Sequence, residues 1–569
     1  MPRRDEPPQA GVRAHSWDHR QPSQRSPGPG MSRPPTPVGL LLPSVTDLVF
    51  CLLLLSLACG PLTRRLLGDA GTGWHIRTGQ IILSTHAIPR DDPFSISTAG
   101  RPWYAWEWLY DGALAAVYQL AGLNGVGVLG ALLIAATFTL LFRMMLRRDT
   151  TVVLAVLLLL LATSASTIHF FARPHVVSWL FTLAWFGLLD SSERTGRTGR
   201  LWCLPLLMLV WVNMHGGFLV GFVLLGIYLA GAGRDARKAG DETQRDSSRQ
   251  RARTLTWVGL LSLMATFVNP YGFRLHVHIY RYLTNRFLMD HIDEFRAPNF
   301  HGIAEQCFAA ILLITLVTLM ASPRKPRLSE LLVVLLAAYS GLLASRNIPV
   351  ASMLLVLVDG PLISAGARVG ATRERVAAGL RSAVAREQWF AERMTRLEFG
   401  LRGHVWPLTV TALLVSICLH NGQLGKRRIM DVQFAPARLP VTAVDYIMQH
   451  RIFSPVFSTD AWGGYLIYRL YPYSRVVVDD RHDLYGEVFL KRYLNIVRVE
   501  PGWKDDLEGM HADWVLVPHN AALANILQLA GGWSIAYQDG TSILFQRAGA
   551  AETGSDRKAG GLALIGCRC

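Results

Sequence analysis

Charged side chains are scarce in this sequence. Asp, Glu, Lys and Arg together make up 17% of the 569 residues, whereas apolar residues make up 51%, and the mean hydropathy is +0.26. A soluble chain of this length needs a larger share of charged and polar residues to cover its surface. The composition therefore argues against a soluble protein and indicates a polytopic membrane protein.

Several sequence signatures of soluble enzymes are missing as well. There is no Walker sequence, and no GxGxxG string follows a predicted strand, which argues against nucleotide binding. There is no GxSxG or HExxH string and no Cys-His arrangement, which argues against an independent hydrolase. The seven cysteines contain no CxxC pair, and they leave the redox compartment open. Those in or beside apolar runs are interpreted as packing residues: Cys51, Cys59, Cys203, Cys307 and Cys418. Cys567 and Cys569 belong to a polar tail.

Acidic residues are outnumbered by basic ones. The chain has 57 Lys and Arg residues against 41 Asp and Glu residues, a formal net charge of +16. The basic residues lie between apolar runs, and no basic face with interleaved aromatic residues is present, so nucleic acid is not the expected partner. The expected partner of this charge is the anionic surface of a membrane.

Eleven apolar segments are long enough, or nearly long enough, to cross a bilayer as helices. They cover residues 41–61, 122–142, 151–168, 174–190, 201–213, 217–232, 255–268, 304–321, 328–344, 347–364 and 404–420. The amphipathic segment from Glu107 to Leu120 predicts a helix that lies at the membrane interface. The predicted fold class is an α-helical polytopic membrane protein with about 11 transmembrane helices over residues 41–420, preceded by a disordered cytoplasmic tail over 1–40.

Loops rich in arginine alternate with loops poor in Lys and Arg. The arginine-rich loops lie at residues 143–148, 194–200, 234–253, 324–327 and 368–402. Such loops remain on the cytoplasmic side of a membrane, which predicts a cytoplasmic N-terminus. This register places the first outer loop, 62–121, and everything after about residue 421 on the outer side.

The last part of the chain has a different pattern. Between Leu439 and Arg547, short β-branched or aromatic runs such as 474–480 and 533–538 alternate with helical patterns such as 487–498. This alternation predicts an extracytoplasmic α/β domain over residues 421–548. Residues 549–569 are predicted to be a flexible tail.

Unusual polar residues concentrate on the predicted outer side. The stretch GDAGTGWHIRTGQIILSTHAIPRDDPFS, residues 68–95, holds Asp69, Asp91 and Asp92, and histidines and arginines follow in FARPH, VNMHGG and SRNIP. We expect these residues to gather in one site at the outer surface. A carboxylate shielded from water there has a raised pKa or holds a divalent cation beside a phosphate. Paired acids of this kind suit glycosyl transfer, in which one acid deprotonates the acceptor.

The motifs DAGTGWHIRTGQIIL, RPWYAWEWLYD, FARPH, VNMHGGF, FVNPYG, SRNIP and VVVDDRHDLYG extend over about residues 41–547. Together they resemble a bacterial group of glycosyltransferase-like membrane proteins of the GT-C class. The resemblance implies an enzyme of the bacterial cytoplasmic membrane that transfers a sugar from a polyprenyl-phosphate donor to an outer lipid, glycan or protein acceptor. It also implies Asp69 as the catalytic base and Asp92 as a second acid, with both as ligands of a divalent cation such as Mg or Mn. Where many relatives carry an adjacent Asp-Glu pair, this chain has Asp91 and Asp92.

Further candidate residues complete the predicted site. His75 is expected to shape it beside the acids, and the expected substrate-binding residues are Asp91, Glu107, Arg173, His175, His215, Arg274, Arg346, Asp480 and Arg481. Arginine suits the donor phosphate because its planar fork pairs two oxygens.

Plainer alternatives stay open for several of these residues. Asp69 fits a cap for the helix that begins near Gly71. Asp480 and Arg481 fit a salt-bridge network, and the histidines fit hydrogen bonds to loose backbone groups. The competing functions are a transporter of lipid-linked sugars and a non-catalytic, glycan-binding assembly protein.

Overall fold

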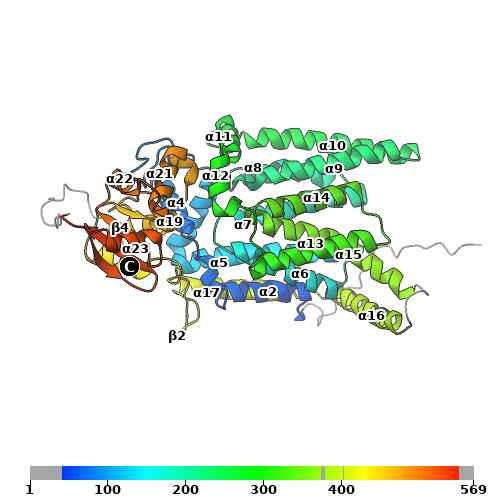
Figure 1. Cartoon of the computed structure of the whole chain (residues 1–569). Coiled ribbons are helices and arrows are strands. Elements are labelled where there is room, and N and C mark those ends of the chain that lie inside the picture. The colour runs from blue at the N-terminus through cyan, green and yellow to red at the C-terminus, as the bar shows by residue number, and fades with distance from the viewer. Residues whose placement is uncertain (1–40, 373–377, 402, 550–569) are drawn as a thin grey trace, which may run out of the picture.

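The structure is a computed structural model that describes residues 41–549 except 373–377 and 402. The predicted tail 1–40 and nearly all of the predicted tail 549–569 lie outside the described residues. Most of the chain forms a bundle of helices that run in one general direction (Figure 1). Its helices are α2 (Val45–Ala58), α5 (Trp108–Arg147), α6 (Val152–Ser166), α7 (His175–Thr195), α8 (Leu204–Trp211), α9 (Leu219–Lys238), α10 (Glu242–Thr266), α13 (Ile303–Ala321), α14 (Leu328–Leu343), α15 (Ile348–Thr372) and α17 (Val405–Leu419).

Every predicted apolar segment contributes to one of these helices, but the number of membrane spans is not confirmed. Within the described residues, five helices are long and apolar enough to cross a membrane, or six if the bent pair α16–α17 counts as one span. The five lie at Trp108–Arg147, Val152–His169, Gly216–Lys238, Ile303–Ala321 and Ser345–Val369. The structure therefore supports a mostly helical membrane protein with five or six candidate spans rather than the predicted eleven.

Local sequence explains where important helices begin and break. A capping box starts α2, because Ser44 Oγ accepts a hydrogen bond from the N–H of Asp47 at 3.2 Å and the Asp47 carboxylate accepts one from the N–H of Ser44 at 2.8 Å. Helix α5 breaks at Ala121 and Gly122, where Gly122 has a φ of +58° that glycine adopts easily. The break separates the predicted interfacial segment from the predicted span.

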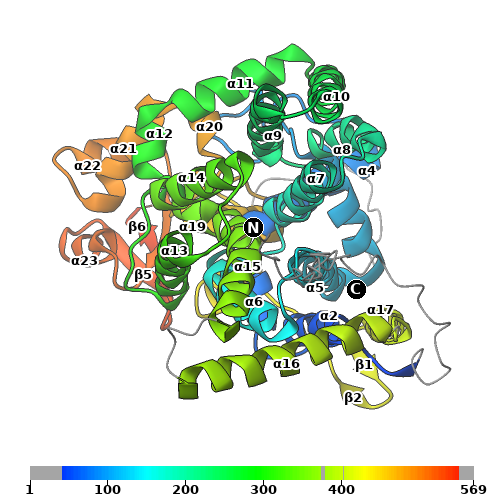
Figure 2. The same ribbon diagram turned by 90° about the vertical axis from the view of Figure 1, so that its right-hand side faces the viewer.

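Shorter elements cover the two ends of the bundle. At one end lie α3 (Thr63–Leu66), α4 (Gly71–Thr85), α11 (Phe273–Thr284), α12 (Arg286–His291) and the turn η4 (Asp293–Phe295). Helix α16 (Ala378–Gly400) lies across the opposite end, seen in Figure 2. The two ends are called here the domain end, which faces the C-terminal domain, and the α16 end.

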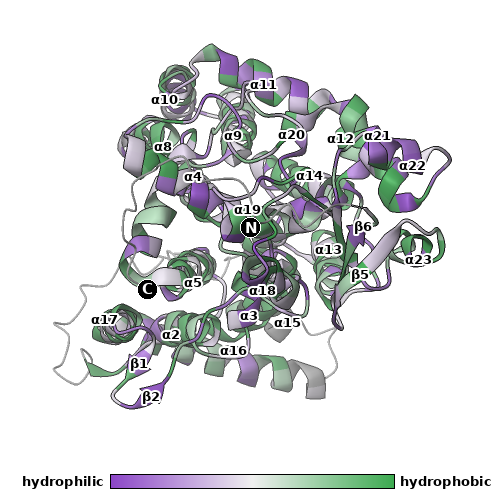
Figure 3. Cartoon of the chain, turned by 90° about the vertical axis from the view of Figure 1, so that its left-hand side faces the viewer, coloured by the Kyte–Doolittle hydropathy of each residue, from purple (hydrophilic) through white to green (hydrophobic). Residues whose placement is uncertain are grey.

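The C-terminal domain is a small α/β unit at the domain end (Figure 1). Its four-stranded sheet has the order β3-β4-β6-β5, with β3 (Val456–Ser458) parallel to β4 (Trp514–Pro518) and β6 (Ser542–Arg547) antiparallel to β4 and β5 (Trp533–Gln538). The helices are α18 (Val441–Gln449), α19 (Asp460–Leu470), α20 (His482–Tyr485), α21 (Glu487–Arg498), α22 (Trp503–Glu508) and α23 (Ala522–Leu529). Figure 3 faces this end and shows that hydrophilic residues are frequent on α21 and α22.

Most of the predicted elements of this domain are present, and one is reduced. The helix at 487–498 and the strand at 533–538 have the predicted bounds. The predicted strand at 474–480 is buried, but it pairs only through isolated bridges of Val476 with Ser95 and Val456. Because Ser95 belongs to the first outer loop, this loop adds to the edge of the C-terminal sheet.

Glycines let the C-terminal domain approach the first outer loop closely. A Cβ on Gly73 of α4 would lie 2.4 Å from the carbonyl oxygen of Gly464 in α19. A Cβ on Gly464 would lie 2.4 Å from the carbonyl oxygen of Ala70. A side chain at either position would push the two helices apart, so the WGGYLIYRL motif fixes α19 against α4. This contact brings residues 479–483 to the domain end of the bundle.

Candidate active site

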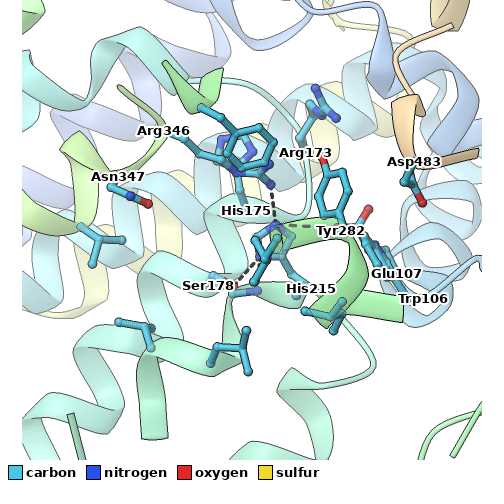
Figure 4. A pocket seen from close by; sticks show the side chains of 18 of the residues that line it. Trp106, Glu107, Arg173, His175, Ser178, His215, Tyr282, Arg346, Asn347 and Asp483 are labelled. Carbon is cyan, nitrogen blue, oxygen red and sulfur yellow. Dashed lines mark hydrogen bonds and ion pairs between the residues drawn. The ribbon is translucent and has the colours of Figure 1, made fainter. Parts of the chain in front are cut away.

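A cavity of about 360 Å³ lies where the bundle meets the C-terminal domain. It is lined by the first outer loop, the N-terminal ends of several bundle helices, α11 and the segment 480–483. Figure 4 shows Glu107, Arg173, His175, His215 and Arg346 converging on it. Residues that are more than 300 positions apart in the sequence therefore line the same cavity.

Arg173 lies at the centre of a group of carboxylates. Its Nη1 lies 3.1 Å from Oδ2 of Asp69 and 3.8 Å from Oε1 of Glu294, and its Nη2 lies 3.4 Å from Oδ2 of Asp480. Asp480 also accepts a hydrogen bond from Nε1 of Trp74 at 3.0 Å. Burial and the nearby Asp69 raise the pKa of Asp480 to about 7, against the opposing effect of Arg173. One guanidinium thus serves three acids, and one of these acids titrates near neutrality.

The absence of a side chain at Gly71 makes this convergence sterically feasible. A Cβ on Gly71 would lie 2.6 Å from Oδ2 of Asp480, 3.0 Å from Cζ of Arg173 and 3.0 Å from Oδ1 of Asp69. The N–H of Gly71 also donates a hydrogen bond to Oδ1 of Asp69 at 2.7 Å. Asp69 therefore holds the start of α4 as well as Arg173, and its role as the base stays a prediction.

A second arginine, Arg346, continues the network along the cavity. Its Nη1 lies 3.5 Å from Oε2 of Glu294, and its Nη2 lies 3.1 Å from Nε2 of His215. Nδ1 of His215 lies 2.8 Å from Oγ of Ser178. Burial raises the pKa of Glu294, but the positive charges of Arg346 and Arg173 lower it to about 2. Glu294 is therefore the carboxylate that neutralises both guanidinium groups.

Glu107 lines the cavity and contacts two histidines rather than an arginine. Its Oε1 lies 3.7 Å from Nε2 of His215, and its Oε2 lies 3.7 Å from Nε2 of His75. Burial raises the pKa of Glu107 to about 7, an effect that the positive charge of Arg173 opposes. Burial also lowers the pKa of His75, whose Nδ1 lies 2.6 Å from Oδ1 of Asp111. A carboxylate that titrates near neutrality suits a general base.

Asp92 lies behind the cavity and pairs with Arg481, which lines it. Nη1 of Arg481 donates to Oδ1 of Asp92 at 2.9 Å, and Nη2 donates to Oδ2 of Asp479 at 2.7 Å. The Asp92 side chain is 0% exposed and also accepts hydrogen bonds from Ser95 and Thr98. Its oxygens are fully occupied and face no solvent. Asp92 therefore holds the first outer loop against the C-terminal domain, and its surroundings do not favour the predicted catalytic role.

Apolar and aromatic side chains form the remaining walls. The apolar residues come from α9, α11, α14 and α15: Leu219, Val220, Ile279, Leu283, Leu336, Val350 and Leu354. The aromatic residues lie toward the outer loop: Trp74, Trp103, Tyr104, Trp106, Tyr282 and Phe295. The cavity is thus polar at one end and hydrocarbon-like between the helices.

The predicted site residues divide into three sets. Those that line the cavity are Glu107, Arg173, His175, His215, Arg346, Asp480 and Arg481. Those that contact a lining residue from behind are Asp69, His75 and Asp92. Asp91 and Arg274 are exposed on the first outer loop and on α11, and neither lines the cavity, so the structure does not place them in a substrate-binding position.

Sequence reasoning missed Glu294 and Asp111. One sequence signal could have indicated Glu294. Asp293 and Glu294 directly follow α12, in a loop on the predicted outer side, where the other candidate acids lie. Asp483 pairs with Nε2 of His278 at 3.0 Å, an interaction between α20 and α11 that the sequence pattern does not reveal.

The two acids predicted to hold a cation do not fit one. Asp69 lies against Arg173 and Asp92 against Arg481, so a different guanidinium group occupies each carboxylate. Among the residues that the structure describes, no group of three or more His, Cys, Asp or Glu side chains is arranged to hold a metal ion. A hard cation takes several oxygen ligands. The surroundings of Asp69 and Asp92 therefore do not support the predicted Mg or Mn site.

Comparison with known proteins identifies the fold. No protein-family model matches the sequence, and no curated protein matches it. The structure is similar to the Archaeoglobus fulgidus oligosaccharyltransferase tethered with an acceptor peptide, with a TM-score of 0.50, 11% identity, and coverage of 83% of this chain and 68% of that chain. ArnT from Cupriavidus metallidurans, bound to undecaprenyl phosphate, aligns with a TM-score of 0.46 and 14% identity over 89% of this chain and 98% of that chain. The first similarity shows that the chain has a GT-C-type fold.

Proposed function

We propose that this protein is an integral membrane glycosyltransferase that transfers a sugar from a polyprenyl-phosphate-linked donor to an acceptor at the domain end of the bundle. One observation carries the proposal: Glu107, with a pKa of about 7, shares a single cavity with two guanidinium groups and an apolar wall. A base, a phosphate-binding group and a surface for a hydrocarbon chain are the parts that this reaction requires.

The donor fits the cavity with its phosphate toward Arg346. This side chain is 32% exposed, and its contact with Glu294 at 3.5 Å is loose, so a phosphate can replace that carboxylate. Phosphate carries more charge than a carboxylate and accepts paired hydrogen bonds from guanidinium. The prenyl chain then follows the apolar wall between α9, α14 and α15, and the sugar lies against the aromatic residues of the outer loop.

In the proposed reaction, an acceptor hydroxyl oxygen attacks the anomeric carbon of the donor sugar. The bond between this carbon and the phosphate oxygen breaks, and its electron pair leaves with the polyprenyl phosphate. Glu107 takes the hydroxyl proton, and Arg346 and Arg173 stabilise the negative charge on the leaving phosphate. The acceptor is of the lipid, glycan or protein class.

Asp69 has a positioning role in this proposal. Its two oxygens hold Arg173, and one of them also holds the first residue of α4. Arg173 engages both oxygens of Asp69, whereas Glu107 lies against histidines beside the cavity, so Glu107 is the better placed of the two acids to receive a proton. The prediction that Asp69 is the base stays testable by direct comparison of the two acids.

The test measures the release of prenyl phosphate from a panel of synthetic prenyl-phosphate hexoses in membranes that contain the protein. Glu107→Gln, which keeps the shape of the side chain, is expected to lower release by about 10² to 10⁴-fold, the usual contribution of a general base. Asp69→Asn is expected to reduce it less. Glu508→Gln, at an exposed position of α22, is the matched control and should leave release unchanged.

Two results would contradict the proposal. Full activity in Glu107→Gln together with complete loss in Asp69→Asn would return the role of base to Asp69. If the wild type binds a prenyl-phosphate sugar but releases no prenyl phosphate with any member of the panel, the protein is a binding or transport protein instead. Protein abundance and donor binding are measured in each variant, so that misfolding is recognised.

A further inference from the structure

A second cavity, of about 150 Å³, lies near the α16 end of the bundle. It is formed where α5 and α7 end, where α14 begins and beside the middle and end of α15. The residues that line it are Arg148, Asp149, Arg194, Arg324, Arg327, Glu330, Pro361 and Arg368. At roughly 30 Å³ per water molecule, this volume holds about five waters, which suits a small polar group rather than a whole sugar.

The floor of this cavity is a closed ion network. Nη2 of Arg148 lies 3.0 Å from Oε1 of Glu330, and Arg148 also pairs with Asp190. Glu330 receives two further donors, Nη2 of Arg324 at 2.6 Å and the N–H of Arg327 at 2.9 Å. The side chains of Arg148, Asp190 and Glu330 are only 2–3% exposed. The acids of the floor are therefore buried and each is paired with arginines.

A proline in α15 fixes Arg148 in this floor. Pro361 has no N–H, so it leaves the carbonyl of Leu357, four residues earlier, without its helical partner. Nε of Arg148 donates to this carbonyl oxygen at 3.0 Å. The arginine thus satisfies a backbone group that the proline releases, and the floor is held by backbone as well as by charge.

The mouth of the cavity presents guanidinium groups with unused donors. Arg194, Arg324 and Arg327 are 29%, 32% and 39% exposed, and each uses only part of its fork in the contacts with Asp190, Glu330 and Glu193. Arg368 is exposed and makes no ion pair within the described part of the chain. Asp149 is the exposed acid among the lining residues. The arrangement therefore offers several N–H groups to an anion at the mouth, with most of the acids below.

We propose that this cavity binds a phosphoryl anion, either the phosphate of an anionic lipid headgroup or free phosphate. Guanidinium groups pair phosphate oxygens two at a time, and the buried floor holds them in place before the anion arrives. The site also lies at an end of a membrane bundle, where anionic headgroups gather near basic residues. It is separate from the cavity of the proposed glycosyl transfer and does not depend on that function.

The test counts ligands bound to the purified full-length protein by native mass spectrometry. Phosphatidylglycerol is compared with phosphatidylcholine, and inorganic phosphate is added alone and as a competitor. The variant Arg324→Gln with Arg327→Gln is expected to bind about 10²-fold more weakly, since each hydrogen bond to a charged group contributes roughly 1.5 kcal/mol or more and 1.4 kcal/mol is tenfold. The control, Arg245→Gln with Arg253→Gln, removes the same charge from exposed positions of α10.

Each outcome decides the proposal. Binding of phosphatidylglycerol that the variant loses and the control keeps supports a lipid headgroup, whereas binding of inorganic phosphate with the same pattern supports the free ion. Two results would overturn the site. One is an equal loss of binding in the variant and the control. The other is a wild type that binds phosphatidylglycerol no better than phosphatidylcholine and does not bind inorganic phosphate. Because Arg324 contacts a buried acid, Arg368→Gln is measured as well. This variant breaks no ion pair among the described residues and should still weaken binding by about tenfold.

Discussion

Two groups of arginines and acids occupy opposite ends of the same bundle. At the domain end, Arg173 and Arg346 lie 3.1–3.8 Å from their acids, and these side chains are 17–32% exposed. At the α16 end, Arg148 pairs with Asp190 and Glu330, and all three side chains are 2–3% exposed. At the first end, the acids that line the cavity are Glu107, Asp111, Asp480 and Asp483. At the second end, Glu330 lies on the floor, and arginines outnumber acids among the lining residues.

The difference shows what a buried charge network can do. Charges that are fully paired and enclosed hold elements together, because removing one partner leaves the other without compensation. Charges that are loosely paired beside an open cavity can exchange a carboxylate for a substrate group. At the domain end, loosely paired arginines lie beside Glu107 and Asp480, whose pKa values are about 7. At the α16 end, a rigid floor holds arginines whose remaining N–H groups are available to a ligand.

The largest expected effect is on stability, and it separates the two ends. Arg148→Ala is expected to destabilise the fold by about 3–5 kcal/mol, because it removes the buried guanidinium group that joins Asp190 to Glu330 and leaves these acids only the partly exposed Arg194 and Arg324 as ion-pair partners. Arg173→Ala is expected to cost about 1–3 kcal/mol, since Asp480 can take up a proton and the cavity admits water. Unfolding is measured in detergent solution as the fraction of the protein that remains monodisperse. Equal losses in the two variants would mean that the domain end is as closed as the α16 end.

The second prediction concerns packing at the domain end. Gly71→Ala would force a methyl group to within 2.6 Å of Asp480 and 3.0 Å of Arg173, so we expect a loss of about 1–3 kcal/mol and a fall in prenyl phosphate release. Gly112→Ala is the control, because a Cβ there would meet nothing within 4 Å. Unchanged release in Gly71→Ala would show that the convergence of these side chains is not needed for the reaction.

The third and smallest effect is a pH dependence. Burial raises the pKa of Glu107 to about 7, and a base acts only when deprotonated, so kcat/KM should rise as the pH increases through 7 and fall nearly tenfold for each unit below it. Asp480 also titrates at about 7, so the profile of Asp480→Asn is measured too. If kcat/KM of Asp480→Asn still falls below pH 7, the titrating group is Glu107. If this fall disappears, the titrating group is Asp480.

Periodicity predicted most of the elements. The apolar runs predicted the bundle helices, and alternating patterns predicted elements such as α21 and β5, because these patterns are local. The number of spans stays a prediction, since several apolar helices are short, including α8 and α14. Length and hydropathy alone do not separate a buried helix from one that crosses a membrane.

The site was predicted in outline rather than in its pairings. Topology indicated that acids, imidazoles and arginines would share one side, and seven of the predicted residues line the cavity. The pairing of Asp92 with Arg481 depends on an edge contact between Ser95 and Val476, which no local pattern encodes. Glu294 was missed for the same reason, because it reaches Arg173 and Arg346 from a short turn without periodicity.

The hydrogen bond between Trp74 and Asp480 joins residues 406 positions apart. The ribosome adds Trp74 long before Asp480. During most of its synthesis, the nascent chain therefore lacks the wall of the cavity that residues 480–483 form. Such a chain has Glu107 and Arg173 but not the Asp480 that faces them. The cavity is therefore completed late in translation, and a product that stops short of residue 480 would lack one wall of the proposed active site.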